Sequence, residues 1–215
     1  MSDPEAHEPS PAFLGALANE QFGLQSVSGI SVSESSSRAA LYLSTLSSGL
    51  VAIGFSATHP TALAALTLSV LPTVFILGCF TIVRLVDTSV ENLVALRRLE
   101  RVRQYWATLD PAGAHFFGPD APKSGYRGVR YGFWAMLFTM ASMIVFVNGV
   151  LAGAIAALLL AIAAGASTAV FLTVGIAVGA VAVVVGLVYE NRRLVPWISG
   201  LSSDTAAGDA ALPGS

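Results

Sequence analysis

Charged residues are scarce in this 215-residue chain: they make up 11% of it, whereas hydrophobic residues make up 54%. Soluble domains carry about 25% charged residues, so the composition excludes an ordinary water-soluble fold. Cysteine is also scarce, and the single Cys79 excludes an intrachain disulfide, a CxxC redox pair and a cysteine-based zinc site. Residues 1–37 contain no Lys or Arg, so we expect no cleaved secretory signal.

Uncharged runs dominate the rest of the chain. The runs at 38–57 and 62–83 are each near the ~20 residues that cross a ~30 Å hydrocarbon core as a helix. Between them, Thr58, His59 and Pro60 predict a tight helical hairpin, with the proline in the first turn of the second helix. Residues 131–189 contain no charged residue and are long enough for two or three crossings.

The positions of the basic residues decide between two and three crossings. All Lys and Arg lie at Arg38, between Arg84 and Arg130, or at Arg192 and Arg193. Basic residues favour the cytoplasmic side, so all three regions are expected there. Three crossings after residue 131 would place Arg192 and Arg193 outside. We therefore predict two spans in region 131–190, at 133–162 and 168–189.

These spans predict an all-α integral membrane protein with four transmembrane helices in two hairpins. We expect it in the plasma or inner membrane, with both termini cytoplasmic. Region 38–84 holds the first hairpin. Pro72 lies inside its second helix and predicts a kink, as a structural irregularity rather than a moving hinge.

The polar segments are expected on the cytoplasmic side. Residues 1–37 and 191–215 are rich in small and polar residues and are predicted to be disordered tails. Alternatively, the weakly amphipathic patch around Phe13, Leu17 and Phe22 forms a helix on the membrane surface or on another part of the chain. In region 85–130, apolar residues recur every three or four positions up to Leu109. This period predicts that the second helix extends into the cytoplasm before a loop.

Small residues recur every fourth position in several spans. Such seams let helix backbones approach closely in lipid. We interpret them as packing within one four-helix monomer, with homo-oligomerisation as the alternative. The seams comprise Ser36, Ala40, Ser44, Ser48, Ala52 and Ser56 in the first span, Gly149, Gly153, Ala157 and Ala161 in the third, and Gly175 and Gly179 in the fourth.

Polar residues within the spans are hydroxyls and one amide. Ser44, Thr45, Ser47, Ser48 and Asn148 are interpreted as contacts between helices, with the lining of a water-filled path as the alternative. Apart from Arg38 at the start of the first run, the predicted spans hold no Asp, Glu, Lys, Arg or His, which argues against an ion-coupled transporter.

Catalytic and metal chemistry find no support in the sequence. The three histidines lie in separate polar segments, so no two share a helical face as metal ligands would. The chain has no GxSxG elbow. We predict no enzymatic activity, no cofactor, no small-molecule ligand and no nucleic-acid partner.

The extension of the second helix carries a group of arginines. We predict that they contact anionic lipid headgroups, each contributing about 1 kcal/mol near the surface. Binding of a nucleotide or nucleic-acid phosphate is the alternative, but no Gly-rich loop accompanies it. These residues are Arg97, Arg98, Arg101 and Arg103.

The segments RAALYLSTLSSG at residues 38–49 and RRLERVRQY at residues 97–105 resemble a group of uncharacterised small bacterial multi-pass membrane proteins. The resemblance covers about residues 30 to 190 and implies a topology without an activity. From the residues we expect a non-enzymatic protein that acts by helix association as a scaffold, sensor or effector subunit. A small passive channel or transporter subunit is the alternative.

Overall fold

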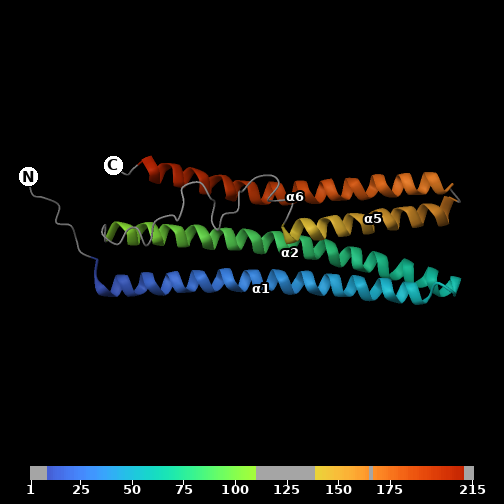
Figure 1. Cartoon of the computed structure of the whole chain (residues 1–215), viewed down its shortest axis with the longest axis horizontal. Coiled ribbons are helices and arrows are strands. Elements are labelled where there is room, and N and C mark those ends of the chain that lie inside the picture. The colour runs from blue at the N-terminus through green and yellow to red at the C-terminus, as the bar shows by residue number, and fades with distance from the viewer. Residues whose placement is uncertain (1–8, 110–138, 165–166, 211–215) are drawn as a thin grey trace, which may run out of the picture.

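The computed structural model describes the backbone of residues 9–109, 139–164 and 167–210, and the side chains of these residues except 163–164 and 197–210. This part of the chain forms four long helices: α1 (Pro11–Phe55), α2 (Pro60–Leu109), α5 (Met140–Ala164) and α6 (Thr168–Ala210) (Figure 1). They form two contacting pairs, α1 with α2 and α5 with α6. The predicted all-α fold is confirmed.

The two pairs lie side by side, and α2 contacts all three of the other helices. The α1–α2 turn lies at the same end of the molecule as the end of α5 and the start of α6 (Figure 1). The start of α5 lies about half-way along α2, so α5 accompanies only one half of the long α1–α2 pair. We call this half the membrane half. The other half, residues 11–37 of α1 with 85–109 of α2, is here called the stalk.

Each helix contains a stretch that is long and apolar enough to cross a membrane. Helix α5 has 25 residues and is about 38 Å long at ~1.5 Å per residue, slightly more than the hydrocarbon core. Its described part begins at Met140, and residues 133–138 of the predicted third span lie outside the described residues. The prediction of four candidate spans is confirmed.

Helix α1 corrects the prediction of a disordered tail over residues 1–37. The helix begins at Pro11, and the side chain of its N-cap Ser10 accepts a hydrogen bond from the backbone N–H of Phe13 at 3.2 Å. Proline is well suited to this first position because the amide it lacks has no partner inside the helix. The 45-residue helix then runs through the predicted tail into the span. Residues 1–8 lie outside the described residues.

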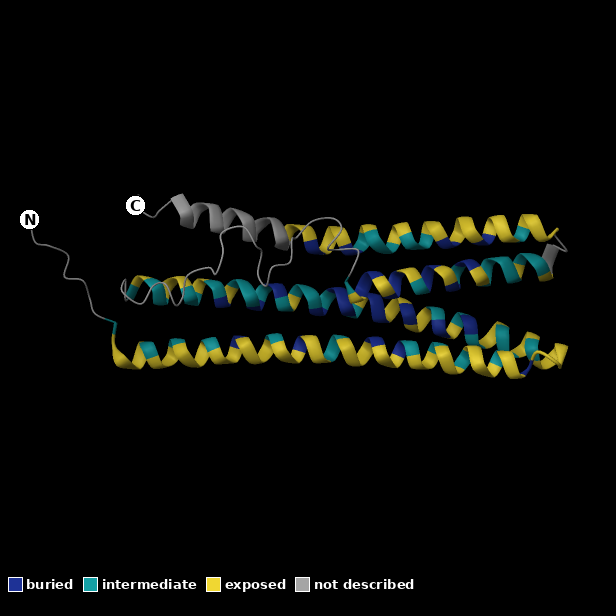
Figure 2. Cartoon of the chain, in the orientation of Figure 1, coloured by how far each residue is buried: buried dark blue, intermediate teal, exposed yellow. Residues whose placement is uncertain are grey.

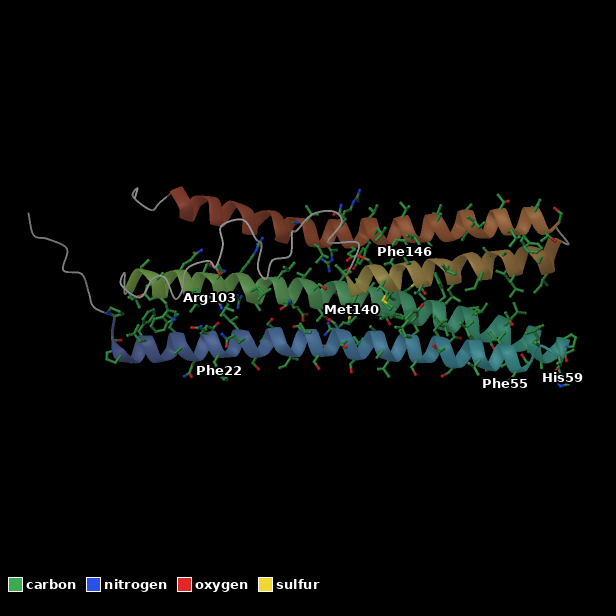
Figure 3. All side chains as sticks on the ribbon, viewed as in Figure 1. Phe22, Phe55, His59, Arg103, Met140 and Phe146 are labelled. Carbon is green, nitrogen blue, oxygen red and sulfur yellow. The ribbon has the colours of Figure 1, made fainter. Side chains whose placement is uncertain are left out.

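Contacts with α2 explain why this segment is ordered. Leu24 is buried with Ala95 and Leu99 in a small apolar cluster of the stalk. Near the start of α1, the ring of Phe13 packs edge-on against Tyr105, with ring centroids 5.8 Å apart. Figure 3 draws the side chains along the whole α1–α2 pair, with Phe22 and Arg103 labelled in the stalk and Phe55 and His59 near the α1–α2 turn. The segment thus lies against another part of the chain, but within one continuous helix rather than as the short separate helix of the alternative prediction.

Helix α6 corrects the second predicted tail, because it continues through Pro196 to Ala210. Leu194 is buried, and the Arg193 side chain donates a hydrogen bond to Asp87 of α2 at 2.8 Å. These contacts attach the helix to α2 beyond the predicted end at residue 189. Residues 211–215 lie outside the described residues.

The turn between α1 and α2 has the predicted form. The Ser56 hydroxyl donates to the carbonyl oxygen of Ile53 at 2.8 Å, and the His59 amide donates to the carbonyl oxygen of Ser56 at 2.9 Å. Helix α2 then starts at Pro60 and runs through Pro72 without interruption. The predicted hairpin is confirmed.

The core is concentrated on α2 and α5, while much of α1 is exposed along its whole length (Figure 2). The main cluster includes Tyr42 of α1, Leu85 and Val86 of α2, and Ile144 and Val145 of α5. Helix α1 therefore sits at the edge of the bundle and buries only one narrow face.

Candidate functional site

The glycine seams of α5 and α6 face each other. A methyl group on Gly153 would lie 2.5 Å from the carbonyl oxygen of Gly175, and one on Gly179 would lie 2.9 Å from the carbonyl oxygen of Gly149. These neighbours are backbone atoms, so the two helices are in direct backbone contact. Ala157 belongs to the same contact and is partly buried, as is Ala161. This small-residue face is occupied inside the chain.

The small-residue face of α1 differs from these seams in its exposure. Five of its six residues are exposed, and Ser56 is buried as the C-cap of the helix. The face of α1 that packs inward lies beside it and carries the buried Ala39 and Tyr42. We call the exposed row the outer ridge; it consists of Ser36, Ala40, Ser44, Ser48 and Ala52.

An open groove of about 580 Å³ lies beside the outer ridge, between α1 and α2. Its hydroxyl groups bond largely to their own helices: Thr45 donates to the carbonyl oxygen of Leu41 at 2.8 Å, and Thr73 donates to that of Ser69 at 2.7 Å. Such bonds satisfy the hydroxyl hydrogen without a partner on another helix. The groove is lined by Ser44, Thr45, Ser48 and Gly49 of α1 and by Ser69, Val70, Thr73 and Val74 of α2.

A buried polar contact joins three helices in the membrane half. Asn148 of α5 accepts a hydrogen bond from the Tyr42 hydroxyl of α1 and donates one to Cys79 of α2, each over 3.4 Å. Gly78 of α2 makes room for it, since a methyl group there would collide with the Asn148 side chain. Asn148 thus contacts other helices, as the sequence suggested, and lies apart from the hydroxyls of the groove.

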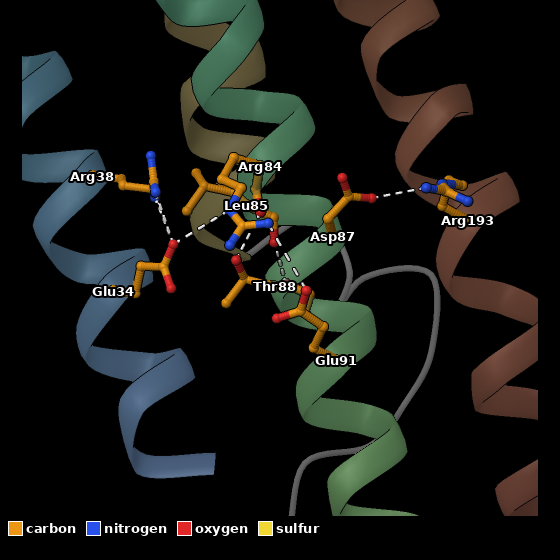
Figure 4. A network of polar contacts seen from close by, with 9 residues as sticks. Glu34, Arg38, Arg84, Leu85, Asp87, Thr88, Glu91 and Arg193 are labelled. Carbon is orange, nitrogen blue, oxygen red and sulfur yellow. Dashed lines mark hydrogen bonds and ion pairs between the residues drawn. The ribbon is translucent and has the colours of Figure 1, made fainter. Parts of the chain in front are cut away.

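Ion pairs connect α1, α2 and α6 where the stalk meets the membrane half (Figure 4). Glu34 pairs with Arg38 at 2.9 Å and with Arg84 of α2 at 3.3 Å, and Asp87 pairs with Arg193 of α6 at 2.8 Å. The hydrogen bond from Arg38, helped by the nearby charge of Arg84, holds the pKa of Glu34 below its usual range. These three arginines and two acids thus tie three helices together at one level.

The four arginines predicted to contact lipid headgroups lie farther along the stalk. From Arg84 to Arg97 the helix rises about 20 Å, and to Arg103 about 29 Å. The stalk continues in line with the membrane half (Figure 1), so headgroup contacts would require it to bend onto the membrane surface. Arg98 and Arg101 are exposed, while Arg97 and Arg103 are partly buried between the stalk helices.

Glu190 is a buried carboxyl group that the sequence interpretation missed. Its side chain is only 1% exposed, and it contacts two hydroxyl groups at the start of α5. The Thr139 hydroxyl donates to one carboxyl oxygen at 2.5 Å, and the Ser142 hydroxyl donates to the other at 3.0 Å. Glu190 directly follows the predicted span at 168–189, and the sequence assigned it no role. Its partners are distant in sequence, and no local signal identified them.

In the described part of the chain, no three His, Cys, Asp or Glu side chains are grouped so that they could hold a metal ion. No family model, curated protein or solved structure matches the chain. The fold itself defines the class: an all-α protein whose four candidate membrane spans imply a lipid bilayer, that is, a multi-pass membrane protein.

Proposed function

We propose that this chain is a non-enzymatic plasma-membrane protein that acts by helix association, as a scaffold, sensor or effector subunit. The observation that carries the proposal is the outer ridge of α1. The corresponding glycine seams of α5 and α6 pack against each other. The residues of the outer ridge are instead exposed, and Ser44 and Ser48 face the open groove between α1 and α2.

A second copy of the chain fits this ridge best. Lipid chains give no hydrophobic drive for helices to associate, so close backbone packing and interhelical hydrogen bonds must supply it. Small residues at every fourth position permit that packing. Copies inserted with the same orientation would present the same row to each other about a two-fold axis, which makes the interface self-complementary. Each hydroxyl contact across it would add about 0.6 kcal/mol.

In such an assembly the stalk would be the part that reaches partners in the cytoplasm. It would project a pair of helices beyond the bilayer and carry exposed arginines such as Arg98 and Arg101. Association of α1 in the membrane half would bring two stalks together, because α1 is one continuous helix through both halves. This orientation assumes cytoplasmic termini. Reporter fusions at residues 59, 115, 166 and 215 should then read outside, inside, outside and inside.

The groove beside the ridge favours a second candidate, a passive path for a small solute or ion. Ser44, Ser48, Ser69 and Thr73 give it a polar wall, but the groove is open to the side, so a closed path would need a second copy. Such a path is a consequence of association rather than a replacement for it.

Replacing Ser48 with Leu separates the two candidates. A bulky side chain on the ridge should abolish the cross-linked oligomer of the purified protein, whereas Ser47→Leu, which changes a neighbouring exposed residue off the ridge, should leave it intact. An intact Ser48→Leu oligomer that has lost solute flux in liposomes would favour the path. If the Ser48→Leu oligomer stays intact and the wild type shows no solute flux, both candidates are refuted.

A further inference from the structure

The carboxyl group of Glu190 and the hydroxyls of Thr139 and Ser142 form a closed triangle of oxygen atoms. The two contacts to Glu190 measure 2.5 and 3.0 Å, and the two hydroxyl oxygens lie 2.8 Å from each other. The backbone N–H of Ser142 also donates to the Thr139 hydroxyl oxygen at 3.1 Å, in the manner of a helix N-cap.

Counting protons shows what this triangle requires. Three oxygen–oxygen contacts of hydrogen-bond length need three hydrogens, but the two hydroxyls supply only two. With an ionised Glu190, both hydroxyls must donate to the carboxylate, and the Thr139–Ser142 contact would bring two oxygens to 2.8 Å without a hydrogen between them. With a protonated Glu190, each group donates once and accepts once, and all three contacts are satisfied.

Burial favours the same state. A buried carboxylate without a cation loses the hydration that stabilises its charge in water. The start of α5 opposes this loss only weakly, because a helix N-terminus stabilises a negative charge by much less than water does. The charged groups at this level are Arg84 and Asp87 of α2 and Arg192 and Arg193 of α6. Arg193, the basic residue one helical turn from Glu190, is paired with Asp87.

Within the part of the chain that the structure describes, the remaining neighbours supply no counter-charge. Helix α5 contains no titratable residue. On α1, Glu34 and Arg38 pair with each other. Burial, the weak effect of the helix terminus and the pairing of the nearby charges therefore together favour the neutral carboxyl group.

We propose that Glu190 is a proton-binding site: the folded protein holds it as the neutral acid, in a ring of three hydrogen bonds that fixes the first turn of α5 to α6. Loss of the proton to water breaks the ring and leaves a buried charge, so the carboxylate must move toward water or Arg193. That movement loosens the α5–α6 contact beside the Asp87–Arg193 pair, which links α6 to α2. This inference does not depend on self-association of α1.

Infrared spectroscopy of the protein in lipid nanodiscs tests the proposal. An exposed glutamic acid, with an ordinary pKa of about 4.3, is ionised at pH 7. The wild type should nevertheless show a carbonyl band of a protonated carboxylic acid at pH 7. The band should be lost in Glu190→Gln and retained in Glu91→Gln, whose carboxylate side chain is 56% exposed. A wild-type spectrum without this band would overturn the proposal, whether or not the variants fold.

The pH dependence of amide hydrogen exchange distinguishes a proton-binding role of Glu190 from a purely structural one. As pH rises and the wild-type band disappears, the amides of Ser142 and Met143 should exchange faster than the intrinsic rate change explains. In Glu190→Gln they should follow the intrinsic rate alone, because an amide cannot ionise. Equal behaviour of the two proteins across the titration would contradict the proposed release of the α5–α6 contact.

Discussion

The Gly153→Ala substitution probes the backbone contact between α5 and α6. The added methyl carbon would lie 2.5 Å from the carbonyl oxygen of Gly175, closer than the 3.0 Å below which such contacts are essentially never seen. The neighbour is backbone and cannot rotate away, so the helices must separate. Overpacking of this kind costs about 1–3 kcal/mol, and removing a helical glycine returns about 1 kcal/mol. We expect a net loss of up to about 2 kcal/mol.

The same substitution at Gly29 is the matched control. Gly29 lies inside α1 with open space around it, so its replacement with Ala should stabilise the helix by about 0.8–1 kcal/mol. Unfolding by SDS titration in mixed micelles, followed by circular dichroism, measures both changes. A Gly153→Ala variant that is as stable as Gly29→Ala would refute the close contact of α5 and α6. The double variant Gly153→Ala/Gly175→Ala should lose less stability than the two single variants lose together, since the first change has already separated the helices.

Three further substitutions or conditions probe the stalk, the polar core and the charged layer. Leu99→Ala should cost about 2 kcal/mol, the low end for a buried leucine, and should speed hydrogen exchange in residues 11–25 while the spans stay protected. Asn148→Ala should cost about 1–3 kcal/mol because it leaves the buried Tyr42 hydroxyl without its partner, whereas Tyr42→Phe should cost less, since the 3.4 Å bond is long. Because Arg38 lowers the pKa of Glu34, the stability from this pair is present above the ordinary carboxylate range. It should fall as pH drops through the lowered pKa, and Glu34→Gln should remove that dependence in thermal unfolding.

The spans were predictable because each one is encoded locally. Uncharged runs of the right length give the helices, and Pro60 after Thr58 and His59 gives the turn. Residues 11–37 and 191–210 were misassigned because their order depends on distant contacts. Leu24 becomes a core residue only against Ala95 and Leu99 of α2.

The candidate sites were only partly predictable for the same reason. A four-residue period identifies small-residue faces on α1, α5 and α6 but does not say which face meets another helix. The seams of α5 and α6 face each other, as the Gly153–Gly175 contact shows. On α1 the face with the buried Tyr42 packs inward, and the outer ridge is left exposed. Glu190 could not be recognised from its neighbours in sequence, since its environment is made by Thr139 and Ser142 across a different helix.

Cysteine scanning of α1 in native membranes tests the central claim of association through the outer ridge most directly. In a Cys79→Ser background, single cysteines at Ser44, Ser48 and Ala52 should form disulfide-linked dimers on mild oxidation, because a disulfide needs Cα atoms about 4.4–6.8 Å apart. A cysteine at Leu50, which is 51% exposed on another face of the same helix, should remain monomeric. Dimers at Leu50 but not at the ridge positions, or no dimers at any of them, would contradict the account.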